Sequence, residues 1–260
     1  MKIYVATHKI ENLEFKSKIY ELILVGSYNK TSHEMLRDDS GENISNKNEN
    51  YCELTGLYWI WKNSTEDIVG LAHYRRFLSK KCISINSKYY LNENDLKKEF
   101  INNKVDIILP KPVYYKGTAE DSFTIAPTKE DMRIVKDVIA KMYPEYIDSY
   151  NKFVNSKQAY LYNMLITRKE IFDKYCEWLF NILFEVERVM DKDTYIHDSY
   201  RKRMFGFLSE RLLNIWVIYN KDNLNIKECY VVNKQIKVLK RIRIMITQTI
   251  RKINAKIKMK

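Results

Sequence analysis

The sequence predicts an α/β fold built around a mainly parallel central sheet. Short β-branched and apolar runs alternate with segments of helical periodicity along most of the chain, the order expected when helices connect parallel strands. The chain has 260 residues, of which 45% are apolar, which is enough to form one large core. This composition excludes a disordered chain, a collagen-like repeat and a disulfide-stapled scaffold.

The predicted strands are short and apolar, and several end at a residue that disrupts extended structure. Gly26 ends the second strand and Pro110 ends the fourth. A polar segment over residues 27–50 is long for a simple connection, so it is either a functional loop or a disordered one. We expect strands at residues 3–7, 23–25, 67–72, 105–109, 160–166 and 230–232.

The predicted helices follow from apolar residues spaced three and four apart. Thr128 and Asp131 form a capping-box-like start to one of them, and Gly206 is expected to interrupt the last. Trp59 and Trp61 are expected to pack in the core rather than to stack on a sugar. We expect helices at residues 51–63, 94–102, 128–142, 170–190 and 203–219.

The positive charge is concentrated at the C-terminus. The formal net charge is +12, but ten of the excess positive charges lie in residues 234–260, which leaves about +2 for residues 1–233. Apolar residues in this tail follow helical spacing, at Leu239, Ile242, Ile246, Ile250, Ile253 and Ile257. We therefore predict a domain over residues 1–233 and a basic amphipathic C-terminal helix over residues 234–260.

This tail has the character of a helix that lies in an anionic membrane interface. The alternative is a terminal helix that packs on the body or on a second copy of the chain. The N-terminus lacks a signal peptide, no stretch approaches the roughly 18 apolar residues of a membrane span, and the cysteines form no C-x-x-C pair. We therefore expect a cytoplasmic protein, peripherally associated with the inner face of the plasma membrane through residues 234–260.

Two polar clusters follow predicted strands, where α/β folds bind their ligands. Thr7, His8 and Lys9 end the first strand, and residues 73–76 (His-Tyr-Arg-Arg) end another. Paired arginines suit a diphosphate, because each planar guanidinium offers bidentate hydrogen bonds. For His8 or His73 alone, a histidine satisfied by a backbone carbonyl is the alternative interpretation, and both stay open.

The densest polar segment lies between these clusters. Residues 38–48 read DDSGENISNKN, residues 51–63 read YCELTGLYWIWKN, and residues 70–76 read GLAHYRR. Together with Ala-Thr-His-Lys at residues 6–9 and GFLSERL at residues 206–212, these motifs resemble a family of bacterial glycosyltransferases. That family comes from capsular and exopolysaccharide gene clusters and has long been catalogued as a domain of unknown function. The resemblance covers about residues 1–232.

The resemblance implies a GT-A-like nucleotide-binding fold that transfers a sugar from a nucleotide-sugar. The implied donor is a UDP-sugar, with UDP-galactose or UDP-galactofuranose suggested by analogy. The implied acceptor is an oligosaccharide linked to a membrane-embedded polyprenyl diphosphate. The residues that would bind the donor are Thr7, His8, Lys9, Asp38, Asn43, Asn48, Arg75, Arg76 and Arg211.

The cofactor question turns on residues 73–76. They occupy the place where many GT-A enzymes carry an acidic D-x-D motif that holds a metal, and this sequence has no acid there. Either Asp38 or Asp39 supplies a ligand for a divalent cation such as Mn or Mg, or Arg75 and Arg76 replace the cation beside the diphosphate. We favour the metal-independent arrangement.

An inverting transfer also needs a base for the acceptor hydroxyl. Glu210 is the preferred candidate, because it follows a Gly-Phe-Leu-Ser segment that opens a helix. Asp39 is the second candidate, and His73 is a further catalytic candidate. The alternative for Glu210 and Arg211 is an ion pair on a helix surface.

Two other classes of function compete with an enzyme. A nucleic-acid-binding protein would use the basic tail and the 20 tyrosines for phosphate contacts and base stacking. The charge, however, lies in one helix and no nucleic-acid-binding motif is present, so we expect no nucleic-acid partner. The other alternative is a non-catalytic protein that retains a sugar-nucleotide fold and binds membranes.

Overall fold

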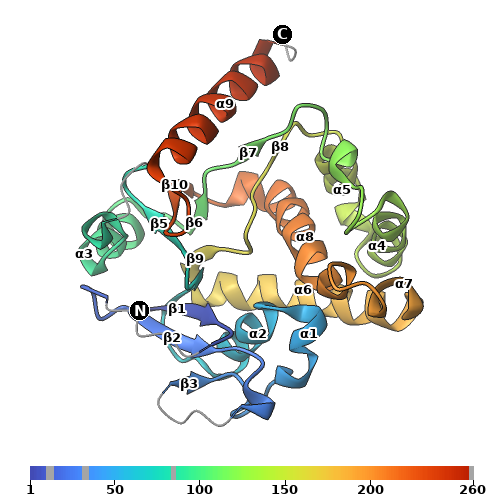
Figure 1. The fold of residues 1–260 in the computed structure, drawn as a ribbon, viewed down its shortest axis with the longest axis horizontal. Coiled ribbons are helices and arrows are strands. Elements are labelled where there is room, and N and C mark those ends of the chain that lie inside the picture. The colour runs from blue at the N-terminus through green and yellow to red at the C-terminus, as the bar shows by residue number, and fades with distance from the viewer. Residues whose placement is uncertain (10–14, 31–34, 83–85, 258–260) are drawn as a thin grey trace.

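The computed structural model describes residues 1–9, 15–30, 35–82 and 86–257. These residues form an eight-stranded sheet in the order β3-β2-β1-β4-β5-β10-β6-β9, and a separate ribbon of β7 and β8 (Figure 1). The strands are β1 (Lys2–Thr7), β2 (Tyr20–Leu24), β3 (Leu36–Arg37), β4 (Ile68–His73), β5 (Arg76–Ser79), β6 (Ile107–Pro110), β7 (Val113–Tyr114), β8 (Gln158–Ala159), β9 (Leu165–Arg168) and β10 (Ile226–Asn233).

The sheet is parallel in its N-terminal half and mixed elsewhere. Strands β3, β2, β1 and β4 are parallel, with Ala6 opposite both Ile23 and His73. Strand β5 is antiparallel to β4 and β10, because the chain reverses at Tyr74 and Arg75, a connection too short for a parallel crossover. Strand β9 is also antiparallel to its neighbours β4 and β6. The prediction of a mainly parallel sheet therefore describes only the half that carries the strand ends of interest.

The predicted strand over residues 160–166 is wrong in its first part. Only β8 and β9, at residues 158–159 and 165–168, are extended there. Tyr162 and Asn163, between them, have positive φ angles of 80° and 50°. Residues other than glycine rarely adopt a positive φ angle, and such a residue interrupts the hydrogen bonding between strands.

Each predicted helix is present, although some differ in detail, and the helices at residues 147–154 and 193–196 were not predicted. The helix expected over residues 51–63 is divided into α1 and α2, because Cys52 has a φ of 51°. The last helix continues through Gly206, since one glycine costs only about 1 kcal/mol in a helix with a buried face. The α-helices are α1 (Asn48–Tyr51), α2 (Leu54–Asn63), α3 (Glu93–Lys97), α4 (Lys129–Met142), α5 (Ile147–Val154), α6 (Lys169–Val189), α7 (Asp193–Ile196), α8 (Met204–Asn220) and α9 (Val238–Ile257).

Local signals in the sequence fix several helix positions. Thr128 and Asp131 form the capping box at the start of α4, as predicted. Helix α3 is capped by Asn92, two residues before the expected start, and continues into the π-helical turn η4 (Lys98–Asn102). Trp59 is buried, with its indole N–H donated to the Ser40 carbonyl oxygen at 3.0 Å, and neither Trp59 nor Trp61 lines a cavity described below.

The hydrophobic core lies on both faces of the sheet. Helices α2, α6 and α8 pack together beside the sheet, and α6 is the longest of the helices buried in the core (Figure 1). A smaller apolar cluster on the other face includes Phe77, Leu96 and Phe100. This two-sided burial makes the sheet a rigid base for the strand ends.

Helix α9 leaves the sheet after β10 and extends along β7 to the far end of the molecule (Figure 1). Its contact face is polar: Gln248 Oε1 accepts the Tyr114 N–H at 2.6 Å, and Arg251 donates to the Tyr114 carbonyl oxygen at 3.3 Å. Among the described helices, none is both long enough and apolar enough to cross a membrane. Lys258 and Lys260 of the predicted tail lie outside the described residues.

Candidate active site

A cavity of about 740 Å³ lies where the parallel strands β1 and β4 end. One wall comes from these strand ends, and the other comes from helical elements. The connection between β8 and β9 adds Leu161 and Tyr162. The strand wall contains Ala6, Thr7, His8, Val25, His73, Tyr74, Arg75 and Arg76, and the helical wall contains Asn48, Glu49, Cys52, Glu53, Tyr200, Arg203, Phe207 and Glu210.

The cavity brings together seven of the residues singled out in the sequence. They come from four separate stretches of the chain, which meet because β1 and β4 are parallel neighbours and α8 packs against α1. The seven are Thr7, His8, Asn48, His73, Arg75, Arg76 and Glu210. The cavity lining does not include the other five, which are Lys9, Asp38, Asp39, Asn43 and Arg211.

The strand wall carries the two arginines. The Arg76 guanidinium lies 4.8 Å from the centre of the Tyr162 ring, and burial, reinforced by the charge of Arg75, lowers its pKa. Arg75 lies 5.4 Å from the centre of the Tyr74 ring and donates to Gln235 Oε1 at 3.2 Å. Two guanidinium groups held on aromatic rings present a fixed positive wall to the cavity.

His73 fits both interpretations that the sequence left open, a histidine satisfied by a backbone carbonyl and a residue of the site. Its Nε2 lies 2.7 Å from the Tyr162 carbonyl oxygen, which can only accept, so Nε2 carries the proton. Burial lowers the pKa of the imidazole below its ordinary value. His73 is therefore neutral at pH 7, satisfied by a backbone carbonyl, and also part of the cavity wall.

Glu210 is half-buried in the lining of the cavity. Its Oε1 accepts the Tyr162 N–H at 2.9 Å, and its Oε2 accepts from Arg211 Nη1 at 2.8 Å. Burial raises the pKa of this carboxyl, and the Arg211 charge opposes that shift. Arg211 therefore pairs with Glu210 from within α8 and does not itself line the cavity.

Glu53 was not predicted, although it lies within a quoted motif. It stands directly before α2, where its Oε1 accepts from Asn163 Nδ2 at 2.8 Å and lies 3.9 Å from His73 Nε2. Its place in the wall depends on the positive φ of Cys52, which the residue pattern did not indicate. Arg203 and Phe207 were not predicted either, because helical periodicity does not show which face of a helix lines a cavity.

Asp38 lies away from the cavity and is completely buried. Its two carboxylate oxygens accept five hydrogen bonds, from Gly26 N–H, Ser27 N–H and the hydroxyls of three residues. Those hydroxyls belong to Ser27, Ser45 and Thr55. A carboxylate saturated in this way does not fit the predicted roles in donor binding or metal coordination.

Asp39 and Asn43 also lie outside the cavity lining. Asp39 pairs with Arg37, whose Nη2 lies 2.6 Å from Asp39 Oδ2, and this hydrogen bond lowers the pKa of the carboxyl. Asn43 is half-buried and forms hydrogen bonds with the backbone of Gly41 and Ser45. Both residues shape the loop before α1, and the structure does not bring Asp39 to the place predicted for a base.

The described residues contain no group of three or more His, Cys, Asp or Glu side chains placed to hold a metal ion. The residues nearest the expected position are the arginines of the strand wall, which repel a cation. These side chains therefore do not fit a protein-built metal site, and the cofactor stays a prediction.

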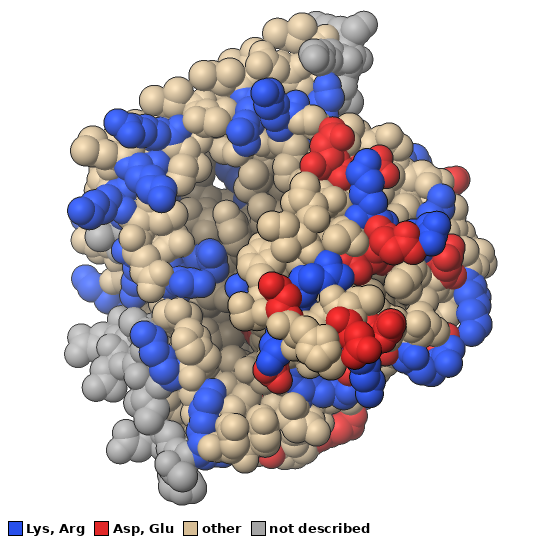
Figure 2. Space-filling view, turned by 45° about the vertical axis from the view of Figure 1, so that its right-hand side comes forward, with Lys and Arg blue, Asp and Glu red and all other residues tan. Residues whose placement is uncertain are grey.

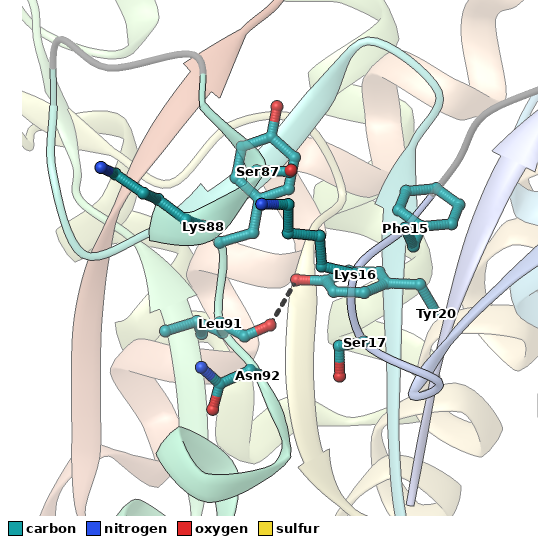
Figure 3. Close-up of a pocket in the computed structure, with 9 residues that line it drawn as sticks. Phe15, Lys16, Ser17, Tyr20, Ser87, Lys88, Leu91 and Asn92 are labelled. Atoms are coloured by element: carbon teal, nitrogen blue, oxygen red, sulfur yellow. Dashed lines mark hydrogen bonds between the residues drawn. The ribbon is translucent and has the colours of Figure 1, made fainter.

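A second cavity, of about 250 Å³, lies at the start of β2 rather than at the strand ends (Figure 3). Its floor contains the stacked rings of Phe15 and Tyr20, and the Tyr20 hydroxyl donates to the Leu91 carbonyl oxygen at 2.8 Å. The two cavities share no lining residue. The predicted site residues therefore gather in the larger cavity alone.

Fold and site together define an α/β protein with a cavity lined by charged side chains at the carboxyl ends of parallel strands, the place where such folds bind nucleotides. The chain belongs to the family described as "Domain of unknown function (DUF4422)", whose model matches residues 2–222. A search of curated proteins finds no match.

The chain is also similar to a solved structure titled "WbbM bifunctional glycosytransferase apo structure". The two share 31% sequence identity with a TM-score of 0.81. The match covers 90% of this chain and 45% of the other, so this chain spans less than half of that bifunctional protein.

Asp38→Ala should lower the free energy of unfolding by about 2–4 kcal/mol, because it leaves the buried Gly26 and Ser27 N–H groups without an acceptor. Urea denaturation measures this change. The neighbouring variant Asp39→Ala is the control, since it removes a partly exposed ion pair and should cost about 1 kcal/mol. Equal losses in the two variants would contradict the central role of Asp38.

His73 should make the protein less stable at acidic pH. Its pKa is lowered from 6.5, so the unfolded chain binds the proton more readily and stability falls as the pH drops below that value. The slope is at most about 1.4 kcal/mol per pH unit. Urea denaturation between pH 7.5 and 5.5 should therefore show a steeper loss for the wild type than for His73→Gln.

The variant His197→Gln is the control for removal of an imidazole, because this side chain is exposed and does not line the cavity. Glu210 acts in the opposite direction, since its raised pKa adds stability as the pH falls. Comparing variants that both retain Glu210 isolates the histidine. Parallel curves for wild type and His73→Gln would disprove the assignment.

Proposed function

We propose that this chain is a glycosyltransferase that moves a sugar from a nucleotide-sugar to a saccharide acceptor. The structural similarity to a bifunctional glycosyltransferase supports the reaction class. The cavity supports it independently, since its volume of about 740 Å³ lies in the range of small-molecule sites.

The observation that carries the proposal is the meeting of an arginine pair and three carboxylates in one cavity. The strand wall holds Arg75 and Arg76, whereas Glu49, Glu53 and Glu210 come from the helical wall, which also holds Arg203. Glycosyl transfer needs a positive environment for the departing diphosphate and a carboxylate near the acceptor hydroxyl. The two walls supply these opposite requirements.

In this proposal the nucleotide diphosphate lies along the ends of β1 and β4. Thr7 and His8 border it on one side, and Arg75 and Arg76 bind its oxygens from the other. The finer description remains a GT-A fold with a UDP-sugar donor, of which UDP-galactose and UDP-galactofuranose are the first to test. The arginines stabilise the negative charge that develops on the leaving group, the metal-independent arrangement that we favour.

The direct test is a panel of nucleotide-sugars incubated with the protein, with and without saccharide acceptors and divalent cations. Release of the nucleoside diphosphate and formation of a glycosylated product are both measured. We expect one UDP-sugar to be consumed. Failure of every donor under all conditions would contradict the proposed function.

Arg76→Ala should reduce kcat/KM for the donor by about 10²–10³-fold, because it removes a diphosphate contact made in the transition state. Arg75→Ala should have a weaker effect in the same direction, since Arg75 is also engaged with Gln235. The matched control is Arg133→Ala, which removes an exposed arginine paired with Glu130. Near-normal transfer by both cavity variants would remove these residues from the diphosphate site.

We further propose that α9 attaches the enzyme to an anionic membrane, where a polyprenyl diphosphate-linked acceptor would be found. Five of the six residues in its apolar stripe are more than half exposed, from 52% at Ile246 to 77% at Leu239. On the face shown in Figure 2, Lys and Arg cover the left side with few acidic neighbours, whereas Asp and Glu lie mainly on the right, together with further Lys and Arg. An apolar stripe flanked by cations is complementary to an interface of anionic lipids.

Replacement of Ile246, Ile250 and Ile253 by Asn should abolish flotation of the full chain with vesicles that contain anionic lipid, because it removes apolar area without changing charge. The control is Thr247→Asn with Thr249→Asn, which are exposed and flank the stripe. Equal flotation of the two variants would contradict membrane attachment by this face, and dimerisation lost with the stripe would favour a second copy as its partner.

A further inference from the structure

In the proposed function the donor binds the strand wall of the cavity, and the helical wall with its carboxylates remains for the acceptor. Glu53, Tyr200, Arg203 and Phe207 line that wall, from the residue before α2, the residues preceding α8, and α8 itself. In sheets of this type the nucleotide occupies the strand ends. The second substrate of a transfer reaction must then approach from the opposite side.

Glu53 has one carboxylate oxygen that the protein leaves free. Its side chain is only 14% exposed, and Oε1 is occupied by Asn163. Among the described residues, Oε2 accepts no hydrogen bond. Oε2 remains accessible to solvent at the cavity, so the hydroxyl of a bound ligand can replace water as its hydrogen-bond donor.

The other carboxylates of the wall differ from Glu53 in this respect. Both oxygens of Glu210 are engaged, one by the Tyr162 N–H and one by Arg211. Glu49 is exposed and pairs with Lys202 at 2.7 Å. Glu53 is therefore the carboxylate whose geometry leaves it able to accept a proton from a bound hydroxyl.

An aromatic platform lies on the same wall. The rings of Tyr200 and Phe207 stack with centroids 4.9 Å apart and planes at 30°, and Tyr200 remains 48% exposed. The Arg203 guanidinium lies 5.1 Å from the centre of the Phe207 ring. A ring held on one face by another ring can bury the apolar C–H face of a sugar against its other face.

Building on the proposed function, we propose that this wall is the acceptor subsite. A saccharide ring packs on Tyr200, and its attacking hydroxyl donates to Glu53 Oε2. Asn163 orients Glu53 through Oε1, so it is a positioning residue. Glu210, preferred as the base from sequence, is in this assignment a positioning residue that fixes Tyr162 beneath Arg76.

The reaction balances without any further reactant. Glu53 takes the hydroxyl proton as the acceptor oxygen forms a bond to the anomeric carbon of the donor. The bond from that carbon to the diphosphate oxygen breaks, and its electron pair remains on the diphosphate beside Arg75 and Arg76. Attack from the wall opposite the leaving group inverts the anomeric configuration.

The test compares Glu53→Gln, Tyr200→Ala and Tyr200→Phe in the full chain, using the donor found in the panel and its saccharide acceptor. Glu53→Gln should lower kcat by about 10²–10⁴-fold and leave the donor KM unchanged, since the amide retains the Asn163 contact but cannot take a proton. The acidic limb of the pH–rate profile should disappear in this variant. A merely structural glutamate would not produce that change in pH profile.

The tyrosine variants report on binding. Tyr200→Ala should raise the acceptor KM about tenfold, and Tyr200→Phe, which keeps the aromatic face, should raise it less. NMR of the product should show inversion. The surface variant Glu130→Gln is the control for loss of a carboxylate.

Three results would overturn the assignment: normal kcat in Glu53→Gln, retention of configuration, or a change of donor KM rather than acceptor KM in Tyr200→Ala. Each of them requires a wild-type enzyme that transfers sugar, so the proposed function would survive. A wild-type chain that consumes no donor would instead contradict the proposed function, and this assignment with it.

Discussion

The buried carboxylate of Asp38 holds together the elements behind the cavity. It accepts from Gly26 and Ser27 at the end of β2, and from Ser45 before α1 and Thr55 in α2. Thr55 in turn accepts from the side chain of Asn48, which lines the cavity. Because one charge satisfies donors from three segments, the polar loop before α1 is fixed against the sheet, and the wall that carries Glu53 is fixed with it.

Tyr162 connects the two walls in front of this support. Its N–H binds Glu210 of the helical wall, its carbonyl oxygen binds His73 of the strand wall, and its ring lies against Arg76. Its φ of 80° is one that costs about 1–3 kcal/mol for a non-glycine residue. The three contacts offset that cost, and they explain why a segment expected to be a strand turns away here.

The sequence indicates the strand ends well, because apolar runs that end at polar residues mark a sheet edge. Thr7, His8, His73, Arg75 and Arg76 are all in the cavity for that reason. The loop acids are a different case. The sequence around Asp38 does not show whether its carboxylate binds a ligand or other groups of the protein. Only the structure shows that it already accepts hydrogen bonds from five protein donors. Residues such as Glu53, whose placement depends on a positive φ at its neighbour, carry no periodic signal.

The packing of α9 bears on the net charge of +12, which is unusual for an ordinary domain. Helix α9 contacts β7 through Gln248 and Arg251, both bound to the backbone of Tyr114. These residues lie on the face opposite Ile246 and Ile250, so the polar contacts fix the rotation that turns the apolar stripe outward. If the helix only covered the body, its apolar face would be the one to pack inward. Since the polar face packs inward instead, the exposed stripe is expected to bind something outside the chain, and its flanking cations favour an anionic surface.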